Sequence, residues 1–310
     1  MIQYFKTVDN DLRTQESECD GVWINLTNPS ADEILKVSRE SGAQEAFLQA
    51  ALDEEETPRI ERDDKQTLIL VDVPVVEPEG TSFIYNTMPL GIVLLDNMVI
   101  TVCLEETTII SDFFLGRIRG FDTCKKTRFI LQLLYKTSVK YLQYLRQVDK
   151  ASTQVEMALH KSLKNRELIQ MLKLEKSLVF FSTSLKANEI VLEKMLKTKF
   201  IKRYPDDEDL LEDVIIENKQ AIEMAAIYRD ILSGTMDAFA SVISNNLNIV
   251  MKFLAAVTII LSVPTLIASF WGMNVDVPFE KTAEGFVIVS VFALFITGIV
   301  TFILWKKKML

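Results

Sequence analysis

Near the carboxyl end of this 310-residue chain, residues that are small, polar or methionine recur at three- and four-residue spacing. This polar stripe consists of Asn248, Met251, Ala255, Thr258, Ser262, Thr265 and Ser269. Such spacing places all seven residues on one face of an α-helix. Hydroxyl and amide groups on an otherwise apolar helix serve either tight helix packing, the commoner cause, or the lining of a water-filled path.

The residues that follow the stripe add oxygen ligands. Gly272, Met273 and Asn274 supply a neutral amide just after the predicted helix, whose last carbonyl oxygens carry a partial negative charge. Asp276 and Glu280 come next. These groups favour a hard, hydrated cation such as Mg²⁺, which gives up its waters reluctantly. Neutral amides can hydrogen-bond that water shell and still release the ion.

Two uncharged apolar runs flank this segment, Phe253 to Trp271 and Gly285 to Trp305. Each has about the 20 residues that a helix needs to cross a bilayer. Because backbone groups find no water in lipid, both runs must be helical. Since two helices cannot enclose a path, a path along the stripe requires an oligomer with one such helix per subunit. The second helix is apolar nearly all round, as an outer, lipid-facing helix should be.

The charges beside these runs predict their orientation. Lys252 precedes the first run, and Lys306, Lys307 and Lys308 follow the second, whereas the loop between them is acidic. The positive-inside rule therefore places both chain ends in the cytosol and the loop outside the cell. The polar, alternating first ten residues do not read as a signal peptide. We expect a multi-pass protein of the cell (plasma) membrane with most of the chain in the cytosol.

Composition argues against several classes of function. A net charge of −9 disfavours nucleic acid as a partner. One histidine and three scattered cysteines do not make a classical zinc site. Phosphate-loop and nucleophile-elbow motifs are not found, so we do not expect an enzyme.

The rest of the chain predicts an α+β cytosolic domain with a mainly antiparallel sheet, followed by long helices and the two membrane helices. Ser30 and Glu33 form a capping box that should begin a helix. Strands are expected at Gln66–Val76, Thr81–Met88 and Leu90–Leu95, among others. One helix of about 65 residues, Asp207 to Trp271, should follow. Its sequence contains just one glycine, Gly234, and one proline, Pro264, and these are the residue types that disfavour a helix. Its apolar stripe is Leu210, Val214, Ala221, Met224, Tyr228 and Ile231.

The predicted division of the chain has seven parts. They are an α/β domain at 1–126, a helical hairpin at 127–205, the cytosolic stalk of the long helix at 206–252, the first membrane helix at 253–271, an external loop at 272–284, the second membrane helix at 285–305 and a basic tail at 306–310.

The C-terminal region resembles the CorA family of magnesium transport proteins. The resemblance rests on Gly272-Met273-Asn274 between two C-terminal membrane helices, on the acidic loop that follows and on the terminal lysine cluster. The resemblance extends through Asn248 to Leu254 and Tyr228 to Gly234 and covers about the last hundred residues. It implies a funnel-shaped homopentamer in the lipid bilayer that carries Mg²⁺ and also Co²⁺ and Ni²⁺, with no organic cofactor.

The resemblance also implies roles for individual residues. Gly272, Met273 and Asn274 would form the selectivity filter, with Asp276 and Glu280 in the acidic outer loop. Along the pore it implies a polar ring at Asn248, a hydrophobic gate at Met251 and Leu254, a lining of Ala255, Thr258, Ser262 and Thr265, and a basic collar at Lys306, Lys307 and Lys308. Pro264 lies one position later than in the common family pattern, which leaves open which of Ser262, Val263 and Thr265 faces the pore.

Family members also have inhibitory Mg²⁺ sites between neighbouring subunits. Their stalk aspartates match Asp237 and, less directly, Asp213. The partner acid is assigned to Glu77, with Glu79 and the run Asp53 to Glu56 as alternatives. Mg²⁺ would then be both transported and regulatory.

Two other functions remain as alternatives. A zinc transporter of the same superfamily is disfavoured by Met273, where such relatives carry Ile, and by the scarcity of His and Cys. A membrane-anchored coiled-coil scaffold would account for the stalk but not for the polar stripe.

Overall fold

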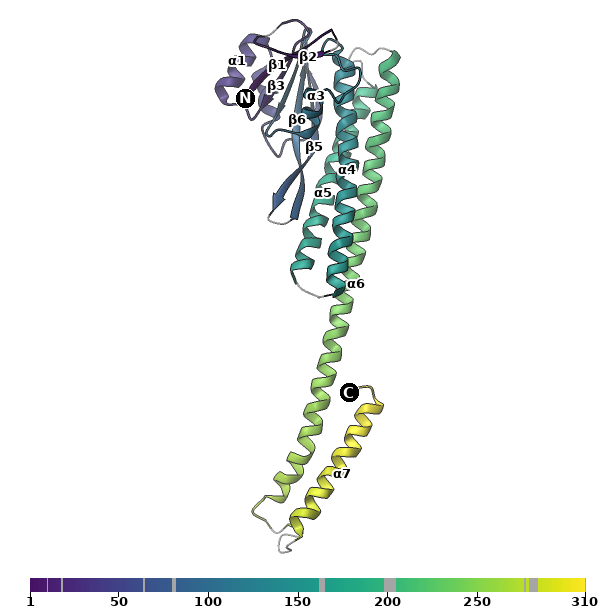
Figure 1. Cartoon of the computed structure of the whole chain (residues 1–310). Helices are drawn as coiled ribbons and strands as arrows, with labels where there is room; N and C mark the ends of the chain where they lie inside the picture. Colours follow the sequence, from purple (N-terminus) through teal and green to yellow (C-terminus); the bar gives the residue numbers. More distant parts are fainter. Residues whose placement is uncertain are drawn as a thin grey trace. The chain divides into compact units, whose positions relative to one another are not determined.

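The computed structural model describes residues 1–310 except 10, 18, 64, 80–81, 162–164, 198–204, 276, 279–283 and 310 (Figure 1). It consists of two compact units, Met1–Gly234 and Thr235–Leu310. The helices are α1 Ala31–Ser41, α2 Glu45–Ala50, α3 Thr108–Phe114, α4 Lys126–Lys161, α5 Asn165–Lys197, α6 Pro205–Trp271 and α7 Gly285–Lys306. The predicted capping box begins α1: Ser30 Oγ accepts from the Glu33 N–H at 3.2 Å, and the Glu33 carboxylate accepts from the Ser30 N–H at 2.9 Å.

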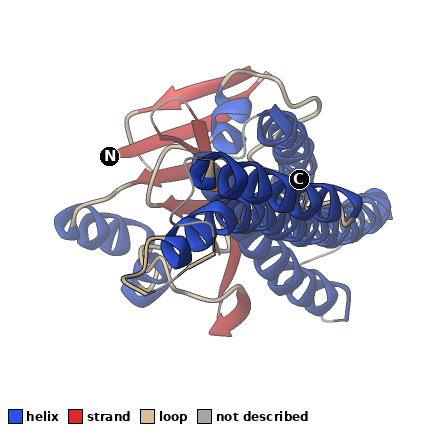
Figure 2. Cartoon of the chain, turned by 90° about the horizontal axis from the view of Figure 1, so that it is seen from below, coloured by secondary structure: helices blue, strands red, loops and turns tan. Residues whose placement is uncertain are grey.

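The first unit contains a seven-stranded sheet in the order β2-β1-β3-β7-β6-β5-β4. Among the described strands, only β3 and β7 pair in parallel, so the expected mainly antiparallel sheet is confirmed. The strands are β1 Ile2–Val8, β2 Asp11–Gln15, β3 Trp23–Thr27, β4 Arg59–Asp63, β5 Gln66–Glu79, β6 Ser82–Leu94 and β7 Val99–Cys103. Figure 2 shows helices on both sides of this layer of strands.

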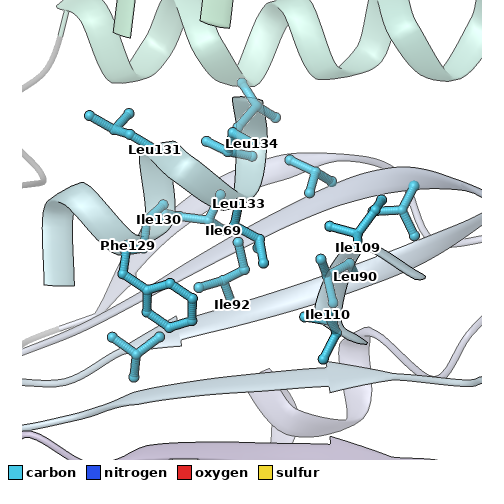
Figure 3. Packing of buried hydrophobic residues seen from close by; sticks show 14 of the residues in the cluster. Ile69, Leu90, Ile92, Ile109, Ile110, Phe129, Ile130, Leu131, Leu133 and Leu134 are labelled. Atoms are coloured by element: carbon cyan, nitrogen blue, oxygen red, sulfur yellow. The ribbon is translucent and has the colours of Figure 1, made fainter. Parts of the chain in front are cut away.

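Successive side chains of β5 alternate between two cores, because strand side chains point to opposite faces. Leu68 and Leu70 pack with α1 and α2 on one face. Ile69 and Val71 pack on the other face with residues of α3, α4, α5 and α6. Figure 3 shows Ile69 in this core beside residues of α3 and α4, such as Ile109 and Leu133. The core that contains Ile69 and Val71 is rich in aromatic contacts around the fully buried Trp23 ring. The long helices are thereby attached to the sheet through apolar packing.

The sequence patterns missed two strands and divided a third. β2 and β4 lie at the two edges of the sheet and are mostly polar, so neither shows the apolar alternation that marks a strand. The expected break between Met88 and Leu90 is wrong, because β6 continues through Pro89, which lies opposite Asp72 of β5.

The strand β5 receives a side-chain partner from α5 at Asp72. The neighbouring strand β4 ends its pairing at Leu70, which leaves the Asp72 backbone beyond its reach. The Asn188 amide takes this place: its Oδ1 accepts from the Asp72 N–H at 2.9 Å, and its Nδ2 donates to the Asp72 carbonyl at 2.8 Å. The Tyr141 hydroxyl of α4 donates to the same carbonyl at 3.2 Å. Buried backbone groups are thus satisfied by the two helices that cover the sheet.

The Asp72 carboxyl gives a prediction for stability. Burial raises its pKa above the usual 3.8, and a hydrogen bond with Ser184 opposes the change. The folded protein therefore keeps a proton that the unfolded chain loses, so the stability contributed by this group falls as the pH rises from 3.8 through the raised pKa. We expect Asp72→Asn to remove this loss.

Thermal unfolding of the full-length protein in detergent at several pH values measures the effect. The melting temperature of Asp72→Asn should rise relative to that of wild type across this pH window, while the exposed control Asp11→Asn should follow wild type. Parallel curves for wild type and Asp72→Asn would contradict the role of the buried carboxyl.

The apolar stripe of the stalk is only partly as predicted. Val214 and Ala221 are buried as expected, but Ile231 is 58% exposed and Leu232 is buried in its place. The polar Asn218 also lies in the buried seam, where its Nδ2 donates to the Leu185 carbonyl of α5 at 3.1 Å. The remaining predicted positions, Leu210, Met224 and Tyr228, are half-buried.

Candidate functional site

The second unit contains two helices long and apolar enough to span a membrane, within the residues described. They lie in α6 and α7, and their apolar stretches are almost entirely exposed. An apolar surface this exposed requires lipid or other protein copies around it. The two helices contain the two predicted membrane runs, Phe253 to Trp271 and Gly285 to Trp305.

The polar stripe faces away from α7. Pro264, Ile267 and Trp271 of α6 line a groove shared with α7 residues that include Val289 and Ala293. At about 100° per residue, Thr258, Ser262, Thr265 and Ser269 lie roughly 160–220° around the helix from Ile267. All four are exposed, as are Asn248, Met251, Leu254 and Ala255. The stripe therefore does not serve packing within one chain.

The stripe is also hollowed. A groove of about 530 Å³ runs along the stripe face of α6. Its lining consists of Thr258, Leu261, Ser262, Thr265, Leu266, Ser269 and Phe270. Val263, by contrast, is half-buried and lies on the side of α6 that faces α7. Of the three positions left open by the shifted Pro264, Ser262 and Thr265 are thus on the stripe face and Val263 is not.

The stripe hydroxyls use their protons inside the helix. Thr258 Oγ1 donates to the Leu254 carbonyl at 2.8 Å, Ser262 Oγ to the Thr258 carbonyl at 2.7 Å and Thr265 Oγ1 to the Leu261 carbonyl at 2.9 Å. Each hydroxyl has one proton and two acceptor lone pairs, so the outward face offers acceptors. Waters around a cation point their hydrogens outward, and an acceptor-rich surface suits such a shell.

The Gly-Met-Asn segment forms a short turn that ends α6. The Gly272 N–H donates to the Ala268 carbonyl at 3.0 Å, and the Met273 N–H to the Phe270 carbonyl at 3.4 Å. A Cβ at Gly272 would lie 3.3 Å from the same Ala268 oxygen, closer than most Cβ atoms approach. Met273 and Asn274 are exposed.

A second contact fixes this turn and was not foreseen from the sequence. Trp271 Nε1 donates to the Pro278 carbonyl at 3.2 Å, which ties the loop back to the end of α6. The Trp271 ring, apolar at one end and polar at the other, also suits a membrane boundary. Asp276 and Glu280 lie outside the described residues.

The predicted regulatory acids lie in both units, Glu77 and Asp213 in the first and Asp237 in the second. Glu77, Asp213 and Asp237 are all exposed, and their carboxylates have no ion pair among the residues described. Nowhere in the described ranges do three His, Cys, Asp or Glu side chains gather as metal ligands.

In the second unit, Lys306 is the last residue of α7 and Lys307 is its C-cap. Lys306, Lys307 and Lys308 are exposed, as a basic collar requires.

Comparisons with known proteins cover nearly the whole chain. The model of the CorA-like Mg²⁺ transporter protein family matches residues 19–308. The cobalt/magnesium transport protein CorA of Methanocaldococcus jannaschii is 31% identical over 91% of this chain and 88% of its own length. The protein of the same name from Thermotoga maritima is 24% identical over 98% of this chain and 88% of its own length.

A solved structure agrees with these matches. The complete structure of the CorA magnesium transporter from Methanocaldococcus jannaschii aligns with a TM-score of 0.85 and 26% identity, covering 98% of this chain and 96% of that one. The resemblance seen in the Gly-Met-Asn motif thus extends well beyond the last hundred residues. The chain belongs to the family of CorA-like Mg²⁺ transporter proteins.

Proposed function

We propose that this protein is a homopentameric channel that carries Mg²⁺, and also Co²⁺ and Ni²⁺, across the plasma membrane into the cytosol. The observation that carries the proposal is the polar stripe, which is exposed on the face of α6 opposite α7 and leads to Asn274. Five copies of α6 with this face inward would enclose a path lined by acceptor oxygens, and α7 would face the lipid. The names of the relatives, cobalt/magnesium transport proteins, support the cations.

Each part of the path has a physical task. Asn274 hydrogen-bonds the water shell of the entering ion, and Gly272 and Met273 shape the turn that presents it. Met251 and Leu254 are both more than half exposed and form an apolar constriction that closes by excluding water. Cytosolic Mg²⁺ bound between subunits at Asp237, and at Asp213 with Glu77, holds the closed state. Both chain ends lie in the cytosol.

The experiment is Mg²⁺ uptake into liposomes that contain only this protein, followed with a dye inside the vesicles. We expect uptake that an inward-negative potential accelerates and that Co²⁺ competes with. Uptake of Zn²⁺ in preference to Mg²⁺ would favour the zinc transporter. A folded, inserted protein that moves neither ion would favour a scaffold.

We also expect a fixed assembly in detergent. The exposed stripe needs several copies to form a path, and the family relationship points to five. Native mass spectrometry of the purified protein should give five times the 35.3 kDa chain mass. A monomer in mild detergent would contradict the enclosed path.

A further inference from the structure

A second groove lies where α6 meets the residues after α7, within the second unit. Its volume is about 340 Å³. It is lined by Ile249, Val250, Lys252, Phe253, Lys308 and Met309. The walls therefore combine two ammonium groups, from segments more than 50 residues apart in the sequence, with four apolar side chains. The conduction path proposed above uses none of these six residues except for the general positive charge of Lys308.

The backbone after α7 is built to reach this groove. Lys308 has a φ of 54°, a left-handed conformation that few residues other than glycine adopt. Hydrogen bonds hold the turn: the Lys308 N–H donates to the Trp305 carbonyl at 3.0 Å and the Met309 N–H to the Leu304 carbonyl at 3.1 Å. Such a C-terminal cap turns the chain back after α7 (Figure 1). Lys308 and Met309 thereby line the groove together with residues of α6.

The groove carries the positive charge of two lysines. Lys252 and Lys308 are exposed, and neither has an ion pair with a carboxylate in the described part of the chain. The nearest acid before Lys252 on α6 is Asp237, about four turns away at 3.6 residues per turn. Two cations beside apolar walls match a ligand with an anionic group and a hydrocarbon part.

The groove is also at the right depth for such a ligand. Lys252 immediately precedes the first membrane run, and Lys308 follows Trp305 at the end of the second. Both lysines therefore lie at the level of the lipid headgroups. That this is the cytosolic leaflet, which carries the anionic lipids, rests on the orientation in the proposed function.

We propose that this groove binds an anionic phospholipid of the cytosolic leaflet. Lys252 and Lys308 bind the headgroup phosphate, and Phe253 packs beside the first carbons of an acyl chain. Bound in this way, the lipid links α6 to the chain end after α7. Lys252 adjoins Met251, so the link fixes α6 at the level of the proposed hydrophobic gate.

The test is native mass spectrometry of the full-length protein taken from phosphatidylcholine vesicles with and without phosphatidylglycerol. Wild type should retain phosphatidylglycerol in preference to phosphatidylcholine. The double variant Lys252→Gln/Lys308→Gln should bind it about 25-fold more weakly, since each lysine near an anionic lipid contributes about fivefold. The matched control Lys306→Gln/Lys307→Gln also removes two positive charges, at the end of the second membrane run, but its residues lie outside the groove.

Three outcomes would overturn the inference. Equal losses in the two double variants would show only general attraction to an anionic surface. Displacement of the lipid by inorganic phosphate at the same concentration would show an anion site without a lipid component. Unchanged retention in Lys252→Gln/Lys308→Gln would place the lipid elsewhere. The oligomer mass, read in the same spectra, shows whether each variant is folded.

Mg²⁺ uptake by wild type into pure phosphatidylcholine vesicles is measured in parallel. Uptake without selective phosphatidylglycerol retention would refute the lipid site and leave the channel proposal standing. Selective retention without uptake would refute the channel proposal alone.

Discussion

Replacing Asn274 by alanine is expected to reduce Mg²⁺ uptake by roughly a hundredfold or more while the protein still folds and inserts. A hydrogen bond that involves a charged partner is worth about 1.5–3 kcal/mol, and the change removes one such group from every subunit around the path. Asn274 is exposed, and the backbone bonds that hold its turn come from Gly272 and Met273. Its side chain can therefore be removed without dismantling the turn.

Uptake by purified variants in liposomes measures this effect. The matched control is Val275→Ala, which truncates the next side chain, itself 58% exposed, and removes no polar group. Its uptake should stay near that of wild type. Full activity in an Asn274→Ala protein with wild-type oligomer mass would exclude the amide from the conduction step.

Gly272→Ala should reduce uptake for a different reason. The added methyl group would lie 3.3 Å from the Ala268 carbonyl oxygen, which accepts the Gly272 N–H. The backbone at residue 272 and the Ala268 carbonyl oxygen must then move apart, and the position of Asn274 changes with them.

Replacing Asp237 by lysine is expected to weaken closure by cytosolic Mg²⁺. Asp237 lies 14 residues before Met251 on α6, roughly 20 Å at the helical rise, so it cannot contact an ion at the gate. It can hold Mg²⁺ together with a carboxylate of the next subunit, because its own side chain is exposed and the described residues give it no cationic partner. In the proposed channel, loss of this ion would leave like charges facing each other and would let the subunits separate.

Patch recordings with stepped cytosolic Mg²⁺ measure this coupling. The Mg²⁺ concentration for half-closure should rise by about tenfold or more, within the usual range of coupling between two sites. Asp209→Lys makes the same charge change near the start of α6, on an exposed residue, and should leave the midpoint unchanged. An identical midpoint in Asp237→Lys and wild type would remove Asp237 from regulation.

The sequence by itself determined the features that depend on local chemistry. The extents of α7 and of the long helix α6 follow from uncharged runs of membrane length and from the near absence of Gly and Pro. The cap at Ser30 follows from a hydroxyl and a carboxylate three residues apart. The polar stripe and the Gly-Met-Asn segment are also visible as spacing alone, since helical geometry turns spacing into a face.

The tertiary structure decided which partner each face meets. Pro89 stays within β6, and the backbone of Asp72 opposite it is satisfied by Asn188, 116 residues after Asp72 in the chain. Edge strands are polar, so β2 and β4 become recognisable only when a neighbouring strand is in place. Along α6 the positions of α4 and α5 determine the buried seam, which places Asn218 inside and leaves Ile231 exposed.

The same distinction applies to the membrane unit. The sequence marks one face of α6 as polar, but only the packing of α7 on the opposite side leaves that face open. The cluster of Lys306, Lys307 and Lys308 is evident from the sequence. The sequence does not reveal which of these lysines lines the groove. The left-handed turn at Lys308 places that one lysine with Lys252 in a groove, while Lys306 and Lys307 lie outside it. Such a turn depends on hydrogen bonds formed after the helix is complete, and spacing along the chain does not reveal it.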